Sequence, residues 1–239
     1  ANGTYRAGKL LRATQLADTQ AEENAEWKYF QLDASGGALR MPQGTVGHRW
    51  QKQHGQWNLD LTDARSGEAY DPALSLKDSA DAVVPVEVAD FSEGRGDVFV
   101  RRGVPVAKIE TVDGPVYVTT GLDLLFAQYG VDRGLDGEWP KGYEDDAALF
   151  TPGWQEKFTG ISSKVCINFA RQWAKTAAKT EGKCSIIIGA GVNHWYHNNL
   201  IYRACIHSLM LCGCVGKNGG GWNHYVGQEK LVPQASWAP

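Results

Sequence analysis

The sequence has no apolar run that approaches the length of about 20 residues that a membrane-spanning helix needs. It also has no recognisable signal peptide. These absences leave open a membrane-bound partner. An excess of charge of one sign is missing as well, because 24 Lys and Arg stand against 27 Asp and Glu, which gives a net charge of −3. This balance provides no basic footprint for nucleic acid, so we expect no nucleic-acid partner.

Cysteine pairs with the spacing of a disulfide framework or a zinc site are also missing. The chain has five cysteines, an odd number that favours reduced, buried thiols. Cys212 and Cys214 are separated by one residue, whereas structural zinc sites usually place two to four residues between paired cysteines. His194 and His197 lie three positions apart, so zinc is a weak alternative, and packing is the favoured role of the cysteines.

The sequence also lacks an initiator Met and a closing helix or strand, so we expect an internal fragment of a larger, multi-domain subunit. Its 239 residues, 43% of them hydrophobic, suffice for one large or two small domains. We expect a β-rich, irregular α+β part over residues 1–120 and an α/β, Rossmann-like part with a parallel sheet over residues 121–239. The expected fold class is therefore α/β.

In the first part, the pattern predicts a short helix over residues 9–16 and a hairpin over residues 27–41. Residues 82–90 read as an edge strand, because Pro85 has no N–H to donate to a strand ladder. A second hairpin follows over residues 98–118. Thr119 or Thr120 is placed to cap a helix over residues 122–129, and Gly130 to end it.

In the second part, apolar residues at helical spacing predict an amphipathic helix over residues 164–178. The run Ser-Ile-Ile-Ile at residues 185–188 is typical of a buried strand in a parallel sheet. A further helix is predicted over residues 198–211. The acidic run at residues 144–146 is interpreted as a solvated surface in preference to a metal site.

The turn after residues 185–188 carries the strongest chemical signal. Gly189 and Gly191 end a strand and feed a helix start, which is an arrangement that suits an anion. The dinucleotide fingerprint needs a third Gly at position 194, where His stands, and an acid about 20 residues later, so nicotinamide binding has little support. A tight turn without any ligand is the alternative.

Amides and imidazoles crowd the residues that follow. Polar side chains at the carboxyl end of a buried strand are costly unless they have partners, and that end is where open α/β sheets bind ligands. Self-satisfied capping by Asn193 or Asn198 is the alternative. A second loop contains Gly219, Gly220 and Gly221, and such a run is tolerated where a ligand or another backbone approaches closely.

Five stretches of the chain resemble the molybdenum oxidoreductases that carry two pterin guanine dinucleotides, and more narrowly the catalytic subunits of membrane-bound respiratory nitrate reductases. The stretches are residues 189–198 (GAGVNHWYHN), 211–216 (LCGCVG), 219–231 (GGGWNHYVGQEKL), 129–135 (YGVDRGL) and 46–50 (VGHRW). The family's His/Cys motif for a [4Fe–4S] cluster and its molybdenum-ligating Asp match nothing in this chain. We therefore assign no metal ligand and no catalytic residue to it.

The resemblance implies a cofactor-binding role for eleven residues. Gly189 and Gly191 would lie near a pyrophosphate, and polar side chains nearby would bind pterin or phosphate. The second loop would pass close to the cofactor through its glycines. The complete set is Gly189, Gly191, Asn193, His194, His197, Asn198, Gly219, Gly220, Gly221, His224 and Gln228.

The resemblance also implies reduction of nitrate to nitrite by oxygen-atom transfer, with quinol electrons arriving through iron–sulfur clusters. The implied partners are an iron–sulfur beta subunit and a membrane cytochrome b gamma subunit, which would hold the protein at the cytoplasmic face of the cell membrane. The isolated fragment should be inactive. Alternatives are a family member acting on chlorate, selenate or a hydrocarbon, a nicotinamide-binding dehydrogenase domain, or a domain that only packs against other subunits.

Overall fold

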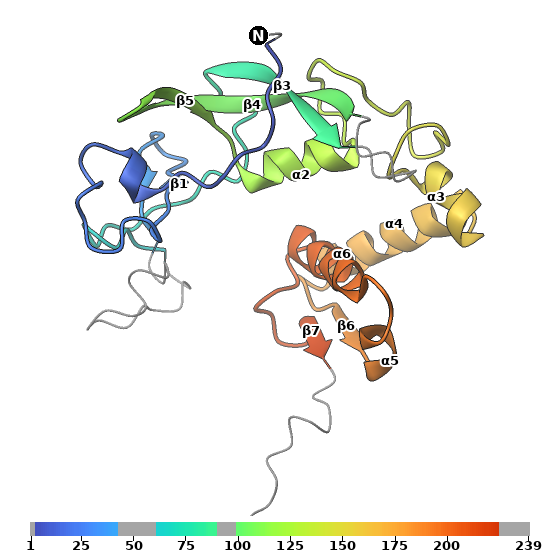
Figure 1. The fold of residues 1–239 in the computed structure, drawn as a ribbon. Coiled ribbons are helices and arrows are strands. Elements are labelled where there is room, and N and C mark those ends of the chain that lie inside the picture. The colour runs from blue at the N-terminus through green and yellow to red at the C-terminus, as the bar shows by residue number, and fades with distance from the viewer. Residues whose placement is uncertain (1–2, 43–60, 90–98, 225–239) are drawn as a thin grey trace, which may run out of the picture. The chain divides into compact units, whose positions relative to one another are not determined.

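The computed structural model describes residues 3–42, 61–89 and 99–224, and it confirms an α/β fold (Figure 1). The chain divides into two compact units, residues 1–158 (unit 1) and residues 159–239 (unit 2). The predicted start of the cofactor-binding part at residue 121 concerns function, and it stays a prediction. The five cysteines are free thiols, as the sequence indicated.

Unit 1 is built on an antiparallel sheet in the order β3-β4-β5, with β3 at Ala82–Ala89, β4 at Phe99–Thr111 and β5 at Gly114–Val118. The predicted edge position of the strand that contains Pro85 is confirmed for this sheet, because β3 pairs only with β4 within it. Beyond β3, the N-terminal segment adds one bridge, in which the N–H of Tyr5 donates to the carbonyl of Pro85. Valines of β3 and β4 form the core with Ala127: Val84, Val86, Val88, Val104 and Val106.

Helix α2 spans Gly121–Tyr129 and packs against this core through Ala127. The predicted caps are confirmed: Thr120 accepts from the N–H of Asp123, and Gly130 ends the helix in the left-handed conformation with φ 71°. Asp123 is fully buried. Its carboxylate pairs with Arg133 at 2.7 Å and accepts from the N–H of Leu76 at 2.8 Å. One carboxylate therefore joins three separate segments of unit 1.

A second buried charge, Arg102 of β4, caps the other end of α2. It is 2% exposed, and its guanidinium donates to the carbonyls of Ala127, Gln128 and Glu138. Carbonyls in the last turn of a helix lack intrahelical donors and carry partial negative charge, which suits a cation. Burial lowers the pKa of Arg102.

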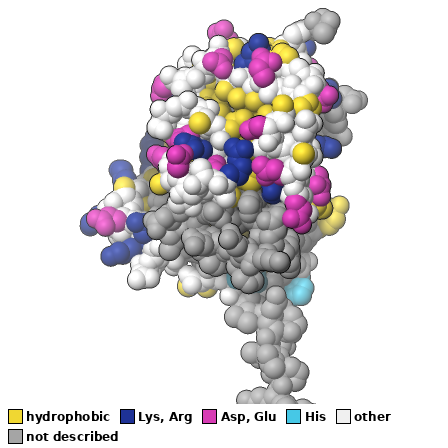
Figure 2. Space-filling model, turned by 90° about the vertical axis from the view of Figure 1, so that its left-hand side faces the viewer, with side chains coloured by type: hydrophobic (Ala, Val, Ile, Leu, Met, Phe, Trp, Pro, Cys, Tyr) yellow, Lys and Arg dark blue, Asp and Glu magenta, His cyan; other side chains and the backbone are white. Residues whose placement is uncertain are grey.

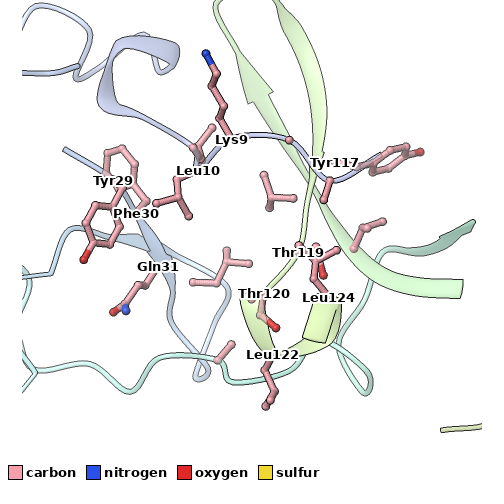
Figure 3. Close-up of a pocket in the computed structure, with 18 of the residues that line it drawn as sticks. Lys9, Leu10, Tyr29, Phe30, Gln31, Tyr117, Thr119, Thr120, Leu122 and Leu124 are labelled. Carbon is pink, nitrogen blue, oxygen red and sulfur yellow. The ribbon is translucent and has the colours of Figure 1, made fainter. Parts of the chain in front are cut away.

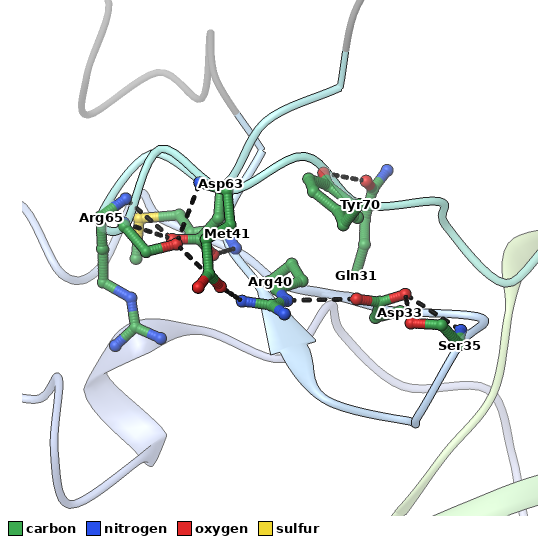
Figure 4. Close-up of polar contacts among 10 residues, drawn as sticks. Gln31, Asp33, Ser35, Arg40, Met41, Asp63, Arg65 and Tyr70 are labelled. Carbon is green, nitrogen blue, oxygen red and sulfur yellow. Dashed lines mark hydrogen bonds and ion pairs between the residues drawn. The ribbon is translucent and has the colours of Figure 1, made fainter.

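A small hairpin lies at the other side of unit 1, with β1 at Gln31–Leu32 and β2 at Leu39–Arg40, where the sequence predicted it. Two buried carboxylates hold the surrounding loops (Figure 4). Asp33 accepts from the N–H and hydroxyl of Ser35 and pairs with Arg40 at 3.3 Å. Asp63 accepts from the N–H groups of Met41, Arg65 and Ser66 at 2.8–2.9 Å.

The predicted helix over residues 9–16 is wrong. Only one 3-10 turn forms there, η1 at Ala13–Gln15. Partners distant in sequence take the hydrogen bonds of this segment: the N–H of Ala13 donates to the carbonyl of Lys28, and the hydroxyl of Thr19 donates to the carbonyl of Ala13. Tertiary pairing therefore outweighs a short helical pattern, which is marginal by itself.

Unit 2 follows helix α3, which spans Pro152–Thr159 at the boundary between the units. Its elements are α4 at Ser163–Lys179, β6 at Ser185–Ile188, α5 at Ala190–Asn193, α6 at Asn198–Leu211 and β7 at Gly221–His224. Its core is small and consists of Ala177, Cys184, Leu209 and Cys214, with Trp173, Ile186, Cys212 and Trp222 packed against it.

The amphipathic face of α4 is only half covered within unit 2. Ala177 is 2% exposed, whereas Val165 and Phe169 on the same face are 58% and 67% exposed. A helix of 17 residues is about 25 Å long, but strands of four residues span only about 13 Å. The first half of the helix therefore extends beyond the sheet that covers its second half.

The charge distribution agrees with the balanced composition. On the face shown in Figure 2, acidic and basic side chains are interspersed around a band of hydrophobic side chains. Among the helices in residues 3–42, 61–89 and 99–224, none combines the length and hydropathy of a membrane span.

Replacing Asp123 by Asn should loosen unit 1 locally, because it removes the buried anion that pairs with the half-buried Arg133. Breaking such a pair costs about 3 kcal/mol or more. Hydrogen exchange on the complete polypeptide should show the amides of residues 75–76 and 120–130 exchanging about 100-fold faster. Glu110→Gln is the control, since its pair with Lys108 at 3.4 Å is exposed to solvent. Equal protection in both variants would contradict this role for Asp123.

Acid should weaken the loops around Asp63. Burial raises the pKa of its carboxyl, but hydrogen bonds from Ser66, Met41 and Arg65 outweigh burial and hold the pKa below its usual 3.8. A lowered folded pKa stabilises the protein above the unfolded pKa, and this contribution is lost as the pH falls through the folded value. In the Asp63→Asn variant, the amides of residues 61–70 should therefore be less protected against hydrogen exchange than in the wild type at pH 7. The deficit should shrink below about pH 4; a deficit independent of pH would contradict the argument.

Candidate functional site

The arrangement of β6 and β7 determines which polar residues meet in unit 2. The two strands pair in parallel, with Ser185 opposite Gly221 and Ile188 opposite His224. Both strands therefore end at the same edge of the sheet, where ligands bind in α/β proteins. We call this site the carboxyl edge and define it as residues 189–198 with Tyr202 and His224.

Two helices follow β6 in succession. The single turn α5 begins directly after Gly189, and the long helix α6 begins only at Asn198, where the sequence predicted it. Between them His197 takes the left-handed conformation, with φ 58°, which turns the chain back toward the sheet. The N–H of Asn198 donates to the carbonyl of Trp195 and that of Leu200 to the carbonyl of His197. The start of α5 is therefore the place where this edge offers N–H groups without intrahelical acceptors.

Asn193 carries the clearest sign of a missing partner. Its Oδ1 is one of three buried side-chain polar atoms without a hydrogen-bond partner in the described part of the chain. Its backbone carbonyl, in contrast, accepts from Nδ2 of Asn198 at 2.8 Å. The alternative of self-satisfied capping by Asn193 or Asn198 thus agrees with the bonded side chain of Asn198, but it leaves the side-chain oxygen of Asn193 without a donor in the described part of the chain.

Exposed aromatic and imidazole groups follow this amide in the sequence. Trp195 is 70% exposed and Tyr196 is 88% exposed, and His194 and His197 are exposed as well. The rings of Tyr196 and His197 lie 3.9 Å apart. Large aromatic side chains gathered at the end of a strand leave much apolar surface in contact with water, and a flat ligand would cover it.

His224 reaches the same edge from the end of β7. Its Nε2 lies 2.8 Å from the hydroxyl of Tyr202, which belongs to α6. The sequence analysis missed Tyr202, since it stands within the helix and outside the polar run at residues 193–199. Only the register of the parallel strands brings Tyr202 and His224 together.

The three consecutive glycines lie elsewhere. They enter β7 at its amino end, so they stand at the edge opposite to Gly189. A Cβ on Gly220 would lie 2.4 Å from the carbonyl oxygen of Gly182 and 2.6 Å from that of Cys214. Gly219 and Gly221 have φ of 85° and 92°, which side chains rarely adopt. Close backbone packing and turn geometry thus account for this loop without any ligand.

Gly189 and Gly191 face open space instead. A Cβ on either residue would meet no atom within 4 Å. Neither has a positive φ, so the fold itself does not require glycine at these two positions. The remaining predicted site residue, Gln228, lies outside the described residues.

A metal site finds no support in residues 3–42, 61–89 and 99–224, where no cluster of three or more His, Cys, Asp and Glu side chains suits a metal ion. In the acidic run, Asp145 accepts from the N–H groups of Lys141, Ala147 and Ala148. These bonds outweigh desolvation and lower the pKa of Asp145. Its role is that of a loop-forming residue.

Unit 1 contains a cavity of about 600 Å³ that the sequence analysis did not predict (Figure 3). Three of its polar lining residues, Gln31, Thr119 and Thr120, already have partners within the chain. Thr119 donates to the carbonyl of Pro105, Thr120 donates to that of Leu74, and Gln31 accepts from Tyr70. Because these groups need no further partner, the cavity gives a weaker indication of a polar ligand than the carboxyl edge.

Comparison with known proteins shows the family to which the chain belongs. The model of the molybdopterin oxidoreductase family matches residues 12–236. The chain is 41% identical to the respiratory nitrate reductase 1 alpha chain of Escherichia coli and 40% identical to the nitrate reductase alpha chain of Bacillus subtilis, over 100% and 99% of its length. A shorter match, 41% identical over 34% of the chain, is to perchlorate reductase subunit alpha of Dechloromonas aromatica. The chain spans about a fifth of the two nitrate reductase chains.

The two kinds of glycine predict opposite results of substitution. Gly220→Ala should prevent unit 2 from packing, because the added Cβ meets two carbonyl oxygens that belong to the backbone. Gly191→Ala should leave the unliganded fold intact. Hydrogen exchange of residues 182–222 in the complete polypeptide, produced without ligand, measures both effects. Wild-type protection in Gly220→Ala would disprove the packing argument.

Proposed function

Because the chain belongs to the molybdopterin oxidoreductase family, we propose that it is part of the catalytic subunit of a respiratory nitrate reductase, with its carboxyl edge holding the organic part of the molybdenum cofactor. Identity of 40–41% along nearly the whole chain to two proteins named as nitrate reductase alpha chains supports the first half. The geometry of unit 2 supports the second half. The family match favours this hypothesis over a nicotinamide-binding domain.

The main observation that supports a cofactor contact at the carboxyl edge is the unsatisfied Oδ1 of Asn193. A buried acceptor without a partner costs about 1–3 kcal/mol, so in the native protein a water or a ligand supplies the donor that the chain does not. Pterin and guanine rings carry N–H groups along their edges, and these groups are suitable donors. The residues present therefore fit the organic part of the cofactor.

The open glycines fit the phosphate part. Gly189 and Gly191 have no neighbour where a Cβ would stand, so a phosphate can approach the backbone there. N–H groups at helix starts bind anions without added positive charge. We assign the pyrophosphate to Gly189 and Gly191, and ring or phosphate contacts to His194, His197, Asn198 and His224.

Gly219, Gly220 and Gly221 receive a different role from the one that the resemblance implies. The positive φ values of Gly219 and Gly221 and the close backbone contacts of Gly220 support a structural function at the opposite edge. We propose that the second loop contributes to the site through its far end, at His224 and the following segment that contains Gln228.

When bound, the molybdenum cofactor supplies the chemistry that transfers an oxygen atom from nitrate. The residues of this chain bind and orient it and keep water from its organic part. We further propose two pterin guanine dinucleotides and a [4Fe–4S] cluster whose ligands lie outside this chain. The proposed partners are an iron–sulfur beta subunit and a membrane cytochrome b gamma subunit, which hold the subunit at the cytoplasmic face of the cell membrane.

A second candidate function, reduction of a chlorine oxyanion, has the perchlorate reductase match in its favour, but that match covers only 34% of this chain. The carboxyl edge would serve the same cofactor in both cases. Turnover of nitrate, chlorate, selenate and perchlorate by the complete enzyme with a reduced viologen dye separates the candidates. A preference for an anion other than nitrate would overturn the nitrate assignment.

Asn193→Ala tests the site. The substitution removes the unsatisfied oxygen but keeps the backbone carbonyl that accepts from Asn198, so the cofactor-free subunit should be at least as stable as wild type. The purified subunit should contain about tenfold less molybdenum and guanine nucleotide after prolonged dialysis, as expected for the loss of one hydrogen bond to the ligand. Asn218→Ala, in the loop at the opposite edge, is the matched control. Wild-type cofactor content in Asn193→Ala would refute the proposed contact.

A further inference from the structure

We infer that Tyr202 is a positioning residue that sets the tautomer and orientation of His224 for contact with the cofactor. This inference rests on the proposed function, and it adds a residue that the polar motifs of the sequence do not contain. Tyr202 lies on α6 and His224 ends β7, 22 positions later. Their hydroxyl oxygen and Nε2 are 2.8 Å apart, which is an ordinary hydrogen-bond length.

The direction of this hydrogen bond follows from the chemistry of the two groups. Neutral imidazole has one nitrogen that donates and one that accepts, and the bond made by one nitrogen decides the role of the other. Imidazole nitrogen is a much stronger base than phenol oxygen, and phenol is a good donor. The hydroxyl of Tyr202 therefore donates to Nε2, and the proton of His224 resides on Nδ1.

The consequence is a histidine that presents a donor to the carboxyl edge. With Nε2 engaged by Tyr202, Nδ1–H is the polar group of the ring that has no partner among residues 3–42, 61–89 and 99–224. A neutral N–H donor suits a pterin carbonyl, a ring nitrogen or a phosphate oxygen. It complements Asn193, whose Oδ1 offers an acceptor at the same edge. The site thus provides groups of both kinds for a heterocycle that carries donors and acceptors side by side.

Aromatic packing holds the pair in place. The ring of Tyr202 lies 5.2 Å from that of Trp222 and 5.4 Å from that of His224, and Trp222 and His224 are stacked at 6.3 Å. Trp222 in turn packs against the buried core of unit 2. The imidazole is therefore restrained by contact with two rings, one of which packs against the core, so that little conformational entropy is lost when it meets a ligand.

The test uses the complete enzyme and four variants. Tyr202→Phe removes the hydroxyl and keeps the ring contacts, so the fold should persist. His224→Asn places an amide donor near the position of Nδ1, whereas His224→Gln places it near the position of Nε2. The fourth variant combines Tyr202→Phe with His224→Gln. Tyr143→Phe, an exposed tyrosine of unit 1, is the control.

Two readouts separate positioning from a general loss of structure. The first is the rate at which molybdenum and guanine nucleotide leave the enzyme during dialysis. The second is the electron paramagnetic resonance spectrum of the half-reduced metal centre, which responds to the orientation of the cofactor. We expect about 5- to 10-fold faster loss and an altered spectrum for Tyr202→Phe. His224→Asn should retain more cofactor than His224→Gln.

The combined variant decides whether the two residues act together. If Tyr202 acts through His224, adding Tyr202→Phe to His224→Gln should have no further effect. An additional loss in the combined variant, or wild-type behaviour of Tyr202→Phe beside an impaired His224→Gln, would overturn the inference. So would better retention by His224→Gln than by His224→Asn. If both His224 variants retain the cofactor as wild type does, the proposed contact of His224 itself is wrong, which is a distinct outcome.

Discussion

The parallel register between β6 and β7 is the constraint on which the candidate site depends. Since Ser185 stands opposite Gly221 and Ile188 opposite His224, the ends of the two strands coincide. A shift of one residue would move the side chains of β7 to the other face of the sheet and separate His224 from α6. The same register sends the three glycines to the far edge. It therefore places two glycine-rich segments of similar composition at opposite edges of the sheet.

Much of the fold was predictable from local signals. Thr120 and Gly130 bound α2 where capping chemistry places them, and the apolar run at residues 185–188 forms a strand of a parallel sheet. The predicted caps and strand are confirmed because their signals act between neighbours in the sequence, but the predicted burial of the strand is wrong for Ile187, which is 82% exposed. Residues 9–16 failed as a helix because Lys28, distant in sequence, takes the N–H of Ala13.

The site was predictable in part, for a related reason. The polar run after β6 is recognisable from its composition, and residues 189–198 do lie at the carboxyl edge of the sheet. The role of the three glycines depends on Gly182 and Cys214, whose carbonyls approach only in the folded chain. Tyr202 carries no motif at all and gains its place from a contact with His224. Composition identifies a polar loop, but only register and packing show which loops face one another.

Unit 2 combines a small core with a carboxyl edge whose exposed rings and unsatisfied amide destabilise the ligand-free fold. Four buried residues form the centre of its core, and the first half of α4 lies outside it. Exposed aromatic rings and the unsatisfied amide of Asn193 add to the cost of the free state. A ligand that satisfies them stabilises the folded form in proportion to its affinity. Binding of a cofactor and completion of the fold are in this sense one process.

Arg102 has a consequence for how sequences of this family are compared. Its planar guanidinium donates in fixed directions to Glu138, Ala127 and Gln128, and a lysine at that position offers no such fork. Evolution should therefore retain arginine there as strictly as it retains residues that meet a substrate. An arginine retained at this position would therefore reflect how a helix is terminated, without indicating a role in the reaction.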